Sequence, residues 1–192
     1  MKKILIGTHN QGKFREIAYL ISKKYKKISP LTLNIKSPKE TGKTFFANSK
    51  IKAKFFSKFV NYPVISDDSG LCIKALGNKP GIHSARLAKK KGGFSSAMRF
   101  ILKQLEKKKN KSAFFVCNLS YVNFDGRIIS AEGKIYGKIS NKILGKKGFG
   151  YDPIFVPNNK KVTFGQMSKL KKIKMDHRYI AFKALKKKIK TL

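Results

Sequence analysis

Acidic residues are scarce in this sequence of 192 residues, so the positions they occupy are informative. The chain has 9 Asp and Glu residues against 45 Lys and Arg residues, a formal net charge of +36. Proteins that read nucleic-acid bases depend on the bidentate fork of arginine, yet arginine occurs only at Arg15, Arg86, Arg99, Arg127 and Arg178. Because the lysines are spread along the whole chain, we interpret their excess as a compositional trait and expect no specific nucleic-acid partner. The charge still favours anionic small substrates and weak polyanion binding at low salt.

Cysteine and long apolar runs are also rare. Cys72 and Cys117 are far apart and form no CxxC pattern, which predicts neither a zinc site nor a disulfide framework. No run of about 18 apolar residues occurs, and no apolar signal-peptide core follows Met1–Lys3. We therefore expect a cytoplasmic protein that has no membrane contact. The length suits a single domain over residues 1–192.

Two of the few acids, Asp67 and Asp68, are adjacent. They follow the apolar run Pro63–Ser66 (PVIS), which predicts a buried strand, and Ser69 and Gly70 come directly after them. We expect the strand to end at the acids and a glycine turn to follow. Mg²⁺ prefers hard oxygen ligands and takes one or two protein carboxylates, so the pair is a candidate metal site. The alternative is a turn held by Asx hydrogen bonds.

A strand–turn–helix junction is predicted at the sequence THNQGK, which comprises Thr8, His9, Asn10, Gln11, Gly12 and Lys13. The preceding strand is expected over Lys3–Thr8 and the following amphipathic helix over Phe14–Tyr25. Such a junction points backbone N–H groups and the positive end of the helix dipole into the turn, which suits a phosphate. The spacing is not that of the GxxxxGK[ST] phosphate loop, so a polar helix cap is an equal alternative.

A second helix is expected from about Thr44 to Asn61, after a loop that contains Glu40. Asn48 and Lys52 are spaced i, i+4 and so share one face of this helix. Glu40 is then a candidate to meet Asp68 at a shared Mg²⁺. On its own, Lys52 would be one solvated lysine among many.

The remaining predicted elements are a half-buried strand at Leu31–Ile35, a flexible break at Lys89–Gly93, a packing helix at Ser95–Lys107, and a hairpin of Ser112–Asn123 and Arg127–Ile139 joined through Asp125-Gly126. The glycine-rich stretch Gly145–Tyr151 offers Phe149 and Tyr151 as aromatic faces for a base, or as core aromatics in a turn. Lys172 and Asp176-His177-Arg178, at the head of the last helix, offer hydrogen-bond donors. We expect an α/β fold: a twisted mixed β-sheet with flanking helices, a long β-hairpin lobe, and the active site in the cleft between lobes.

Five separated motifs occur in order along the chain. They are THNQGK at Thr8–Lys13, ETGKTFFANSKIKA at Glu40–Ala53, SDDSGL with PGIHSAR within Ser66–Arg86, GFGYDPIF at Gly148–Phe155, and DHR at Asp176–Arg178. Together they resemble the inosine triphosphate pyrophosphatase family, the non-canonical purine nucleoside triphosphate pyrophosphatases. The resemblance runs from about Met1 to the last predicted helix, and five motifs in register are far more specific than any one.

The resemblance implies a hydrolase that converts ITP, dITP or XTP to the monophosphate and pyrophosphate, with Mg²⁺ as cofactor and a homodimer as assembly. It places the triphosphate at Thr8–Lys13, the metal at Glu40 and Asp68, and catalysis at Asp68, as general base, with Lys52. It further implies that the remaining substrate contacts are Ser69, Phe149, Gly150, Tyr151, Asp152, Lys172, His177 and Arg178. Donors at Lys172, His177 and Arg178 would suit a 6-oxo purine and leave buried donors unpaired against ATP.

The chain departs from the family pattern near its end. The family usually has Glu at the position of Gln166, an acid and then Lys-Asn at Lys171, Lys172 and Ile173, and Ser at the position of Asp176. A carboxylate near the 6-position can accept a hydrogen bond from the amino group of adenine. We therefore expect weaker exclusion of ATP than the family shows.

Two other classes of protein remain. A non-enzymatic nucleic-acid-binding protein would account for the charge but would give Glu40, Asp67 and Asp68 no role. A pyrophosphatase acting on modified pyrimidines or on ordinary triphosphates would keep the acids and use another base pocket. The division of metal and base roles among the three acids is open.

Overall fold

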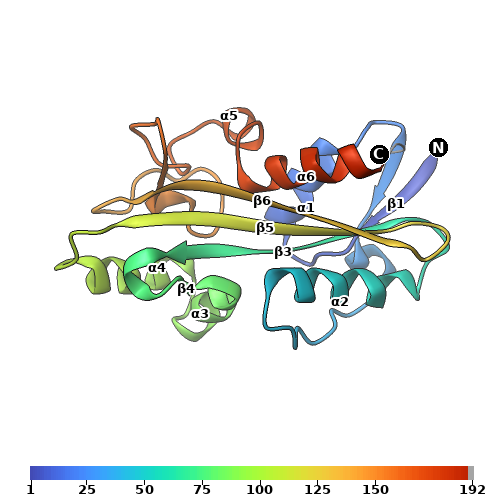
Figure 1. Cartoon of the computed structure of the whole chain (residues 1–192), viewed down its shortest axis with the longest axis horizontal. Helices are drawn as coiled ribbons and strands as arrows, with labels where there is room; N and C mark the ends of the chain where they lie inside the picture. Colours follow the sequence, from blue (N-terminus) through green and yellow to red (C-terminus); the bar gives the residue numbers. More distant parts are fainter. Residues whose placement is uncertain (190–192) are drawn as a thin grey trace. The chain divides into compact units, whose positions relative to one another are not determined.

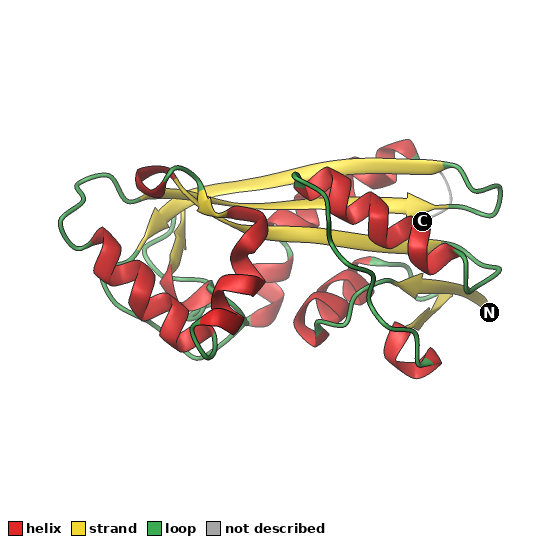
Figure 2. Cartoon of the chain, turned by 90° about the horizontal axis from the view of Figure 1, so that it is seen from below, coloured by secondary structure: helices red, strands yellow, loops and turns green. Residues whose placement is uncertain are grey.

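The computed structural model describes residues 1–189 and divides the chain into two compact units. Unit 1 contains residues 1–68, 117–133 and the chain from Arg178 onward, and unit 2 contains residues 69–116 and 134–177. Three long strands belong in part to each unit; these are β3 (Val64–Ile73), β5 (Ser112–Val122) and β6 (Ile128–Ile139). They are the long yellow arrows in Figure 2.

Unit 1 is built on parallel strands. Its further elements are β1 (Lys2–Ile6), α1 (Gln11–Leu20), β2 (Tyr25–Ile28), the 3₁₀ helix η1 (Pro30–Leu33), α2 (Phe45–Ser57) and α6 (His177–Lys188). β1 pairs in parallel with β2, Leu5 lying opposite Ile28, and with β3, Leu5 lying opposite Val64. The end of the β5–β6 hairpin completes the unit.

Strand alternation gives the sheet of unit 1 two buried faces. Successive side chains point to opposite sides of a strand. Ile4, Ile6 and Ile65 pack in one core cluster with residues of α1 and α6, whereas Leu5 and Val64 pack in another cluster with residues of α2. Figure 1 accordingly shows α1 and α6 on one side of the strands and α2 on the other.

Unit 2 has a single apolar core. Its own elements are η2 (Lys74–Leu76), β4 (Lys79–Pro80), η3 (Gly81–His83), α3 (Ser84–Lys90), α4 (Phe94–Leu105), η4 (Asp152–Ile154), β7 (Phe155–Pro157) and α5 (Lys169–Ile173). Ala97, Met98, Ile101 and Leu105 recur at helical spacing on α4 and are all buried in this core. β4 pairs antiparallel with β3, and β7 pairs antiparallel with β6.

The strand order β2-β1-β3-β5-β6-β7, with β4 also paired to β3, makes one mixed sheet of seven strands. The expected α/β class, with a mixed sheet and flanking helices, is confirmed. The hairpin contributes to both units rather than to one lobe. No helix within residues 1–189 has the length and apolarity needed to cross a membrane.

Three expected elements were wrong. The acids do not end a strand, because β3 continues through Asp67 and Asp68 to Ile73. Leu31–Ile35 is not a strand: Ser29 caps the 3₁₀ helix η1, Pro30 occupies its first turn, and Leu31 and Leu33 are exposed. The first helix begins at Gln11 and ends at Leu20, so Tyr25 lies in β2.

The other predicted elements agree with the structure to within a few residues. α2 begins after Thr44, whose side chain accepts a hydrogen bond from the backbone N–H of Ala47. α4, β5 and β6 lie within one or two residues of the expected bounds. The stretch expected to be a flexible break begins inside α3, which ends at Lys90, so only its last residues form the turn.

Candidate functional site

The two adjacent acids of β3 point to opposite faces of the sheet in unit 1. Asp67 follows Ile65 on the face covered by α1 and α6, and Asp68 follows Ser66 on the face covered by α2. Asp67 is fully buried and Asp68 is 4% exposed. Strand alternation therefore gives the two carboxylates separate surroundings.

Asp67 is held by cations. The Lys13 ammonium lies 3.0 Å from Asp67 Oδ2, and Arg178 Nε lies 3.8 Å from the same oxygen. Burial opposes ionisation of this carboxyl group, but the positive charges of Lys13 and Lys52 outweigh it, so the pKa of Asp67 lies far below its usual range. Asp67 is therefore ionised at neutral pH and holds the neighbouring cations.

Asp68 has a more basic carboxylate. Asn48 on α2 donates from Nδ2 to Asp68 Oδ2 at 3.0 Å, and its Oδ1 accepts from the backbone N–H of Gly42 at 2.8 Å. The amide is thus oriented by the chain before α2. Burial raises the pKa of Asp68, Glu40 raises it further, and Lys13 and Lys52 offset only part of the rise. A raised carboxyl pKa suits a general base better than an ordinary one.

Lys52 lies among the acids of unit 1. Its ammonium is 2.8 Å from Glu40 Oε1, and it is 6% exposed although it is a lysine. Burial would lower the pKa of Lys52, but the charges of Asp67, Asp68 and Glu40 raise it above its usual value. Burial likewise opposes ionisation of Glu40, and the Lys52 charge and hydrogen bond bring the pKa of Glu40 below its usual value.

The junction at Thr8–Lys13 forms the polar helix cap that was one of the two alternatives, and phosphate binding there stays a prediction. Asn10 is the N-cap of α1, and its Oδ1 accepts from the backbone N–H of Lys13 at 3.0 Å. Gln11, Gly12 and Lys13 form the first turn, so Lys13 stands at the positive end of the helix dipole. His9 is tied to the next loop, with Nε2 2.9 Å from Ile35 O and Nδ1 2.6 Å from Ser37 Oγ.

A divalent metal fits the acids of unit 1. Within residues 1–189 no group of three or more His, Cys, Asp or Glu side chains is arranged to hold a metal ion. Mg²⁺ needs only one or two carboxylates when phosphates and waters complete its shell. Glu40 and Asp68 are close enough for the charge of Glu40 to raise the pKa of Asp68, and a cation would relieve that repulsion.

A second group of predicted residues lies in unit 2. Lys172 and Asp152 form a buried ion pair between Nζ and Oδ2 at 2.5 Å. The same oxygen accepts from the backbone N–H of Phe149 at 2.8 Å, and the Phe149 ring lies 4.5 Å from the Lys172 ammonium. Gly148 is required beside this pair: its φ is +75°, and a Cβ there would lie 2.1 Å from Asp152 Oδ2. Asp152 thus orients both Phe149 and Lys172.

Tyr151 occupies the core of unit 2, which favours the packing alternative for this aromatic. Its hydroxyl donates to Ser84 O at 2.9 Å and its ring packs edge-on against Phe94. Burial raises the pKa of the phenol well above its usual value. Gly150 adopts a positive φ of 67°, and Ser69 is half-buried in β3.

His177 and Asp176 are both buried at the end of unit 2. The His177 ring stacks on Phe115 of β5 with centroids 4.8 Å apart and planes 11° apart. Arg178, the next residue, belongs to unit 1, where Nη1 donates to Glu16 Oε2 at 2.8 Å. The tripeptide predicted as one donor group therefore contributes to both units.

Three partners of the predicted residues were missed. Phe115 lies within the predicted strand Ser112–Asn123, and nothing in its sequence surroundings distinguishes it from an ordinary core aromatic. Glu16 had a signal, since it is one of 9 acids and lies three residues after Lys13. Asn48 was predicted to share a face with Lys52, but its bond to Asp68 depends on contacts across 20 residues.

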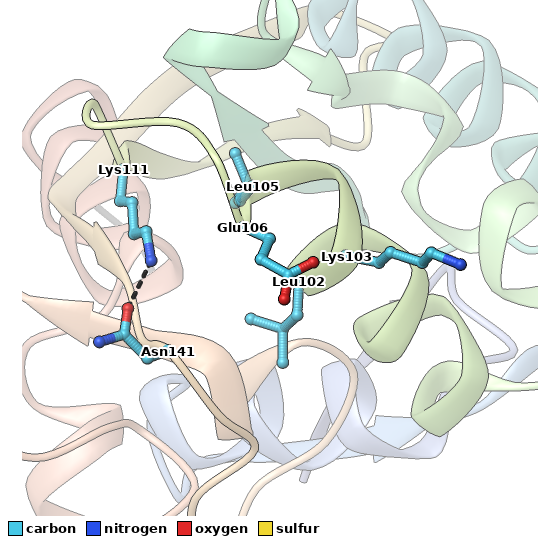
Figure 3. Close-up of a pocket in the computed structure, with 6 residues that line it drawn as sticks. All are labelled: Leu102, Lys103, Leu105, Glu106, Lys111 and Asn141. Atoms are coloured by element: carbon cyan, nitrogen blue, oxygen red, sulfur yellow. Dashed lines mark hydrogen bonds between the residues drawn. The ribbon is translucent and has the colours of Figure 1, made fainter.

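Unit 2 also contains an open hollow of about 600 Å³, shown in Figure 3. It is lined by Leu102, Lys103, Leu105, Glu106, Lys111 and Asn141, and the Lys111 ammonium donates to Asn141 Oδ1 across it. None of these residues is among those predicted for the site.

These features define an α/β protein whose unit 1 holds paired acids and lysines, with Lys13 in the first turn of α1 and Lys52 within α2, and whose unit 2 holds a buried lysine beside an aromatic ring. Residues 4–188 match the Ham1 family, and the chain belongs to this family. It is 38% identical over 187 residues to a dITP/XTP pyrophosphatase of Zymomonas mobilis, with 95% of this chain and 90% of that protein covered. It is 40% identical over 196 residues to a dITP/XTP pyrophosphatase of Borrelia duttonii, covering 97% and 96%.

Solved structures agree with this assignment. The Staphylococcus aureus Ham1 protein superimposes with a TM-score of 0.86 at 33% identity, over 98% of each chain. A HAM1 protein from Coxiella burnetii gives a TM-score of 0.88 at 30% identity, over the whole of both chains.

Proposed function

We propose that this protein hydrolyses non-canonical purine nucleoside triphosphates (ITP, dITP and XTP) to the monophosphate and pyrophosphate. Such an enzyme removes deaminated purines from the nucleotide pool. The observation that carries the proposal is the group formed by Glu40, Lys52 and Asp68 in unit 1, where an acid of raised pKa lies beside a second acid and a buried lysine. The names of the relatives support the substrate class. Mg²⁺ as cofactor and a homodimer as assembly belong to the proposal.

In the proposed reaction, Asp68 accepts a proton from water as the water oxygen attacks the α-phosphorus. The bond from the α-phosphorus to the α–β bridging oxygen breaks, and pyrophosphate leaves with its electron pair. Asn48 orients the Asp68 carboxylate for this transfer. Glu40 and Asp68 would hold Mg²⁺, which when bound polarises the phosphates.

Lys13 and Lys52 would offset the negative charge of the triphosphate. Both are already held by acids, Lys13 by Asp67 and Lys52 by Glu40, so little ordering is needed when the substrate binds. The ammonium of Lys52, buried and of raised pKa, stays charged at neutral pH.

In unit 2, Phe149 would stack on the purine and Lys172 would donate to its 6-oxo group. The ion pair with Asp152 holds the Lys172 ammonium next to the Phe149 ring, so the stacking surface and the donor are fixed together. His177, stacked on Phe115, would be a second base contact. Donors that pair with a 6-oxo group are left unpaired when adenine binds, because adenine has an amino group at that position. Each unpaired buried donor costs about 1–3 kcal/mol of binding free energy.

The test is pyrophosphate release from ITP, XTP, dITP, ATP, GTP and dTTP with Mg²⁺, for the wild type and Asp68→Asn. We expect release from the 6-oxo non-canonical purines to fall by about 10²–10⁴-fold in Asp68→Asn, the usual contribution of a general base. Glu106→Gln, which removes an exposed acid of unit 2, is the control and should keep full activity.

Three outcomes separate the alternatives. Activity confined to pyrimidine or ordinary triphosphates would keep the acid site and reject the proposed base contacts. An equally active Asp68→Asn protein would reject the proposed base. Absence of turnover with every nucleotide, together with nucleic-acid binding that falls steeply with salt, would favour the nucleic-acid-binding alternative.

A further inference from the structure

Glu16 is a buried acid to which the proposed reaction assigns no task. It lies on α1 three residues after Lys13, so the two side chains share one face of the helix. It is 4% exposed, and its Oε2 accepts from Arg178 Nη1 at 2.8 Å. An acid is rarely buried in this way unless it is paired, and here the partner is equally buried at 3% exposure.

Arg178 and Lys13 compete for the same oxygen. Lys13 Nζ is 3.0 Å from Asp67 Oδ2, and Arg178 Nε is 3.8 Å from that atom. Two acids and two bases thus form a row of ion pairs in unit 1, in the order Glu16, Arg178, Asp67, Lys13. The shorter contact from Arg178 goes to Glu16, and the shorter contact to Asp67 comes from Lys13.

Removing the charge of Glu16 would disturb this row. The buried guanidinium would then be drawn toward Asp67, the other acid of the row, because leaving a buried charge without compensation is costly. As Arg178 drew closer to Asp67 Oδ2, the ion pair between the Lys13 ammonium and Asp67 would weaken, and the ammonium would be less firmly positioned. Lys13 stands in the first turn of α1, where the helix dipole already favours an anion.

We propose that Glu16 is a positioning residue for phosphate binding: it fixes Arg178, which leaves the Asp67 carboxylate to hold the Lys13 ammonium at the head of α1. The inference rests on the proposed function for the identity of the anion, a nucleoside triphosphate. In this inference the side chain of Arg178 contributes to phosphate binding through Asp67 and Lys13, and not to recognition of the base. Glu16 itself touches no reacting atom.

The experiment compares Glu16→Gln, which keeps the shape of the side chain and removes its charge, with the wild type and with the Glu106→Gln control. Inorganic tripolyphosphate is the probe, and calorimetry measures its binding without turnover. We expect Glu16→Gln to bind about 10–100-fold more weakly, by analogy with the loss that follows removal of a residue that orients a metal ligand. With ITP, KM should rise by a similar factor and kcat should change little, because Lys13 would bind substrate and transition state alike.

A second variant, Glu16→Asp, helps to separate an effect on stability from an effect on phosphate affinity. It retains the charge one methylene short of Arg178, so we expect intermediate affinity for tripolyphosphate. Urea unfolding of each variant gives the folded fraction, and affinities are compared per folded molecule. A role confined to stability would lower the unfolding free energy of Glu16→Gln and leave its affinity unchanged, which would overturn the proposal.

The outcomes also separate this inference from the proposed function. A wild type that hydrolyses no nucleotide but binds tripolyphosphate more tightly than Glu16→Gln does would reject the proposed function and support the positioning role. The inference would be overturned if Glu16→Gln changed the preference between ITP and ATP and left tripolyphosphate binding unchanged. That result would show that Arg178 acts in recognition of the purine base.

Discussion

At the scale of single residues, the adjacent acids of β3 show how different surroundings give two identical carboxyl groups different pKa values. Asp67 lies beside Lys13 and Arg178 and has a lowered pKa, whereas Asp68 lies beside Asn48 and has a raised pKa. A peptide unit separates them, yet the sheet lies between their side chains. We propose that Asp67 organises cations and that Asp68 takes the proton, a division that the sequence left open.

The lowered pKa of Asp67 predicts an acid-dependent loss of stability. Folding favours its ionised form, so its contribution is complete above the ordinary carboxyl pKa of about 3.9 in the unfolded chain and is lost as the pH falls below it. Asp67→Asn removes this contribution and leaves buried cations short of an anion. We expect its unfolding free energy at pH 7 to be about 3 kcal/mol below that of the wild type.

Urea unfolding of both proteins between pH 7 and pH 3 measures the effect. The difference between wild type and Asp67→Asn should be constant down to about pH 4 and then narrow, and Glu106→Gln should follow the wild type throughout. A difference that stayed constant to pH 3 would show that the Asp67 charge contributes nothing to folding.

Asp176 predicts weaker discrimination against ATP. It is 1% exposed, directly before the buried His177, and its carboxylate can accept from the amino group of adenine. Asp176→Ser should therefore lower ATP turnover relative to ITP, by about tenfold if one hydrogen bond is lost. Pyrophosphate release from the two nucleotides measures the ratio; equal ratios in wild type and variant would contradict the prediction.

At the scale of elements, helix α2 carries Asn48 and Lys52 and is docked on the sheet by polar contacts. Ser49 Oγ donates to Asn118 Oδ1 at 3.0 Å and lies 2.8 Å from Ser120 Oγ, both on β5. Ser49→Ala leaves buried polar atoms unsatisfied, which we expect to cost about 1–3 kcal/mol of unfolding free energy. Turnover per folded molecule should also fall, because α2 positions the site residues.

Ser57→Ala is the matched control for this prediction. Ser57 is half-buried on the last turn of α2, where its hydroxyl donates to Lys54 O, and its loss should cost at most about 0.5 kcal/mol. Ser120→Ala, alone and combined with Ser49→Ala, completes a double-mutant cycle. Additive losses would show that the two hydroxyls do not act together.

Elements whose apolar residues recur at a regular spacing could be predicted from the sequence. The structure at residues that interrupt such a spacing could not. α2, α4 and the β5–β6 hairpin follow from apolar spacing and turn residues. The strand β3 could not, because SDDSG resembles a turn unless distant partners compensate its buried carboxylates. Those partners come from α1, α2 and α6. They compensate the unfavourable burial of the two carboxylates only once the chain has folded.

The candidate site was predicted as a set of residues, and its internal organisation was not. Motif spacing brought forward Lys13, Glu40, Lys52 and Asp68, which the structure groups in unit 1. It could not show that Asp152 and Lys172 form a buried pair, because they are 20 residues apart. Nor could it show that His177 and Arg178, adjacent in sequence, contact different cores.

At the scale of the whole molecule, the net charge of +36 has two opposite consequences. Like charges repel within the folded chain and lower its stability, while the same field attracts an anionic substrate. The Debye length falls from about 30 Å at 0.01 M to about 8 Å at 0.15 M salt. Added potassium chloride should therefore raise the unfolding free energy and lower kcat/KM for ITP, with the Mg²⁺ concentration held constant.

A variant with fewer exposed lysines distinguishes the field of the molecule from the charges in the site. Lys107, Lys108 and Lys109 are consecutive and exposed, and none is among the proposed site residues. Replacing all three with glutamine should make both salt dependences shallower, since each depends on the total charge, and should leave kcat unchanged. If kcat/KM kept its full salt dependence in this variant, the exposed charges of Lys107, Lys108 and Lys109 would have no part in substrate capture.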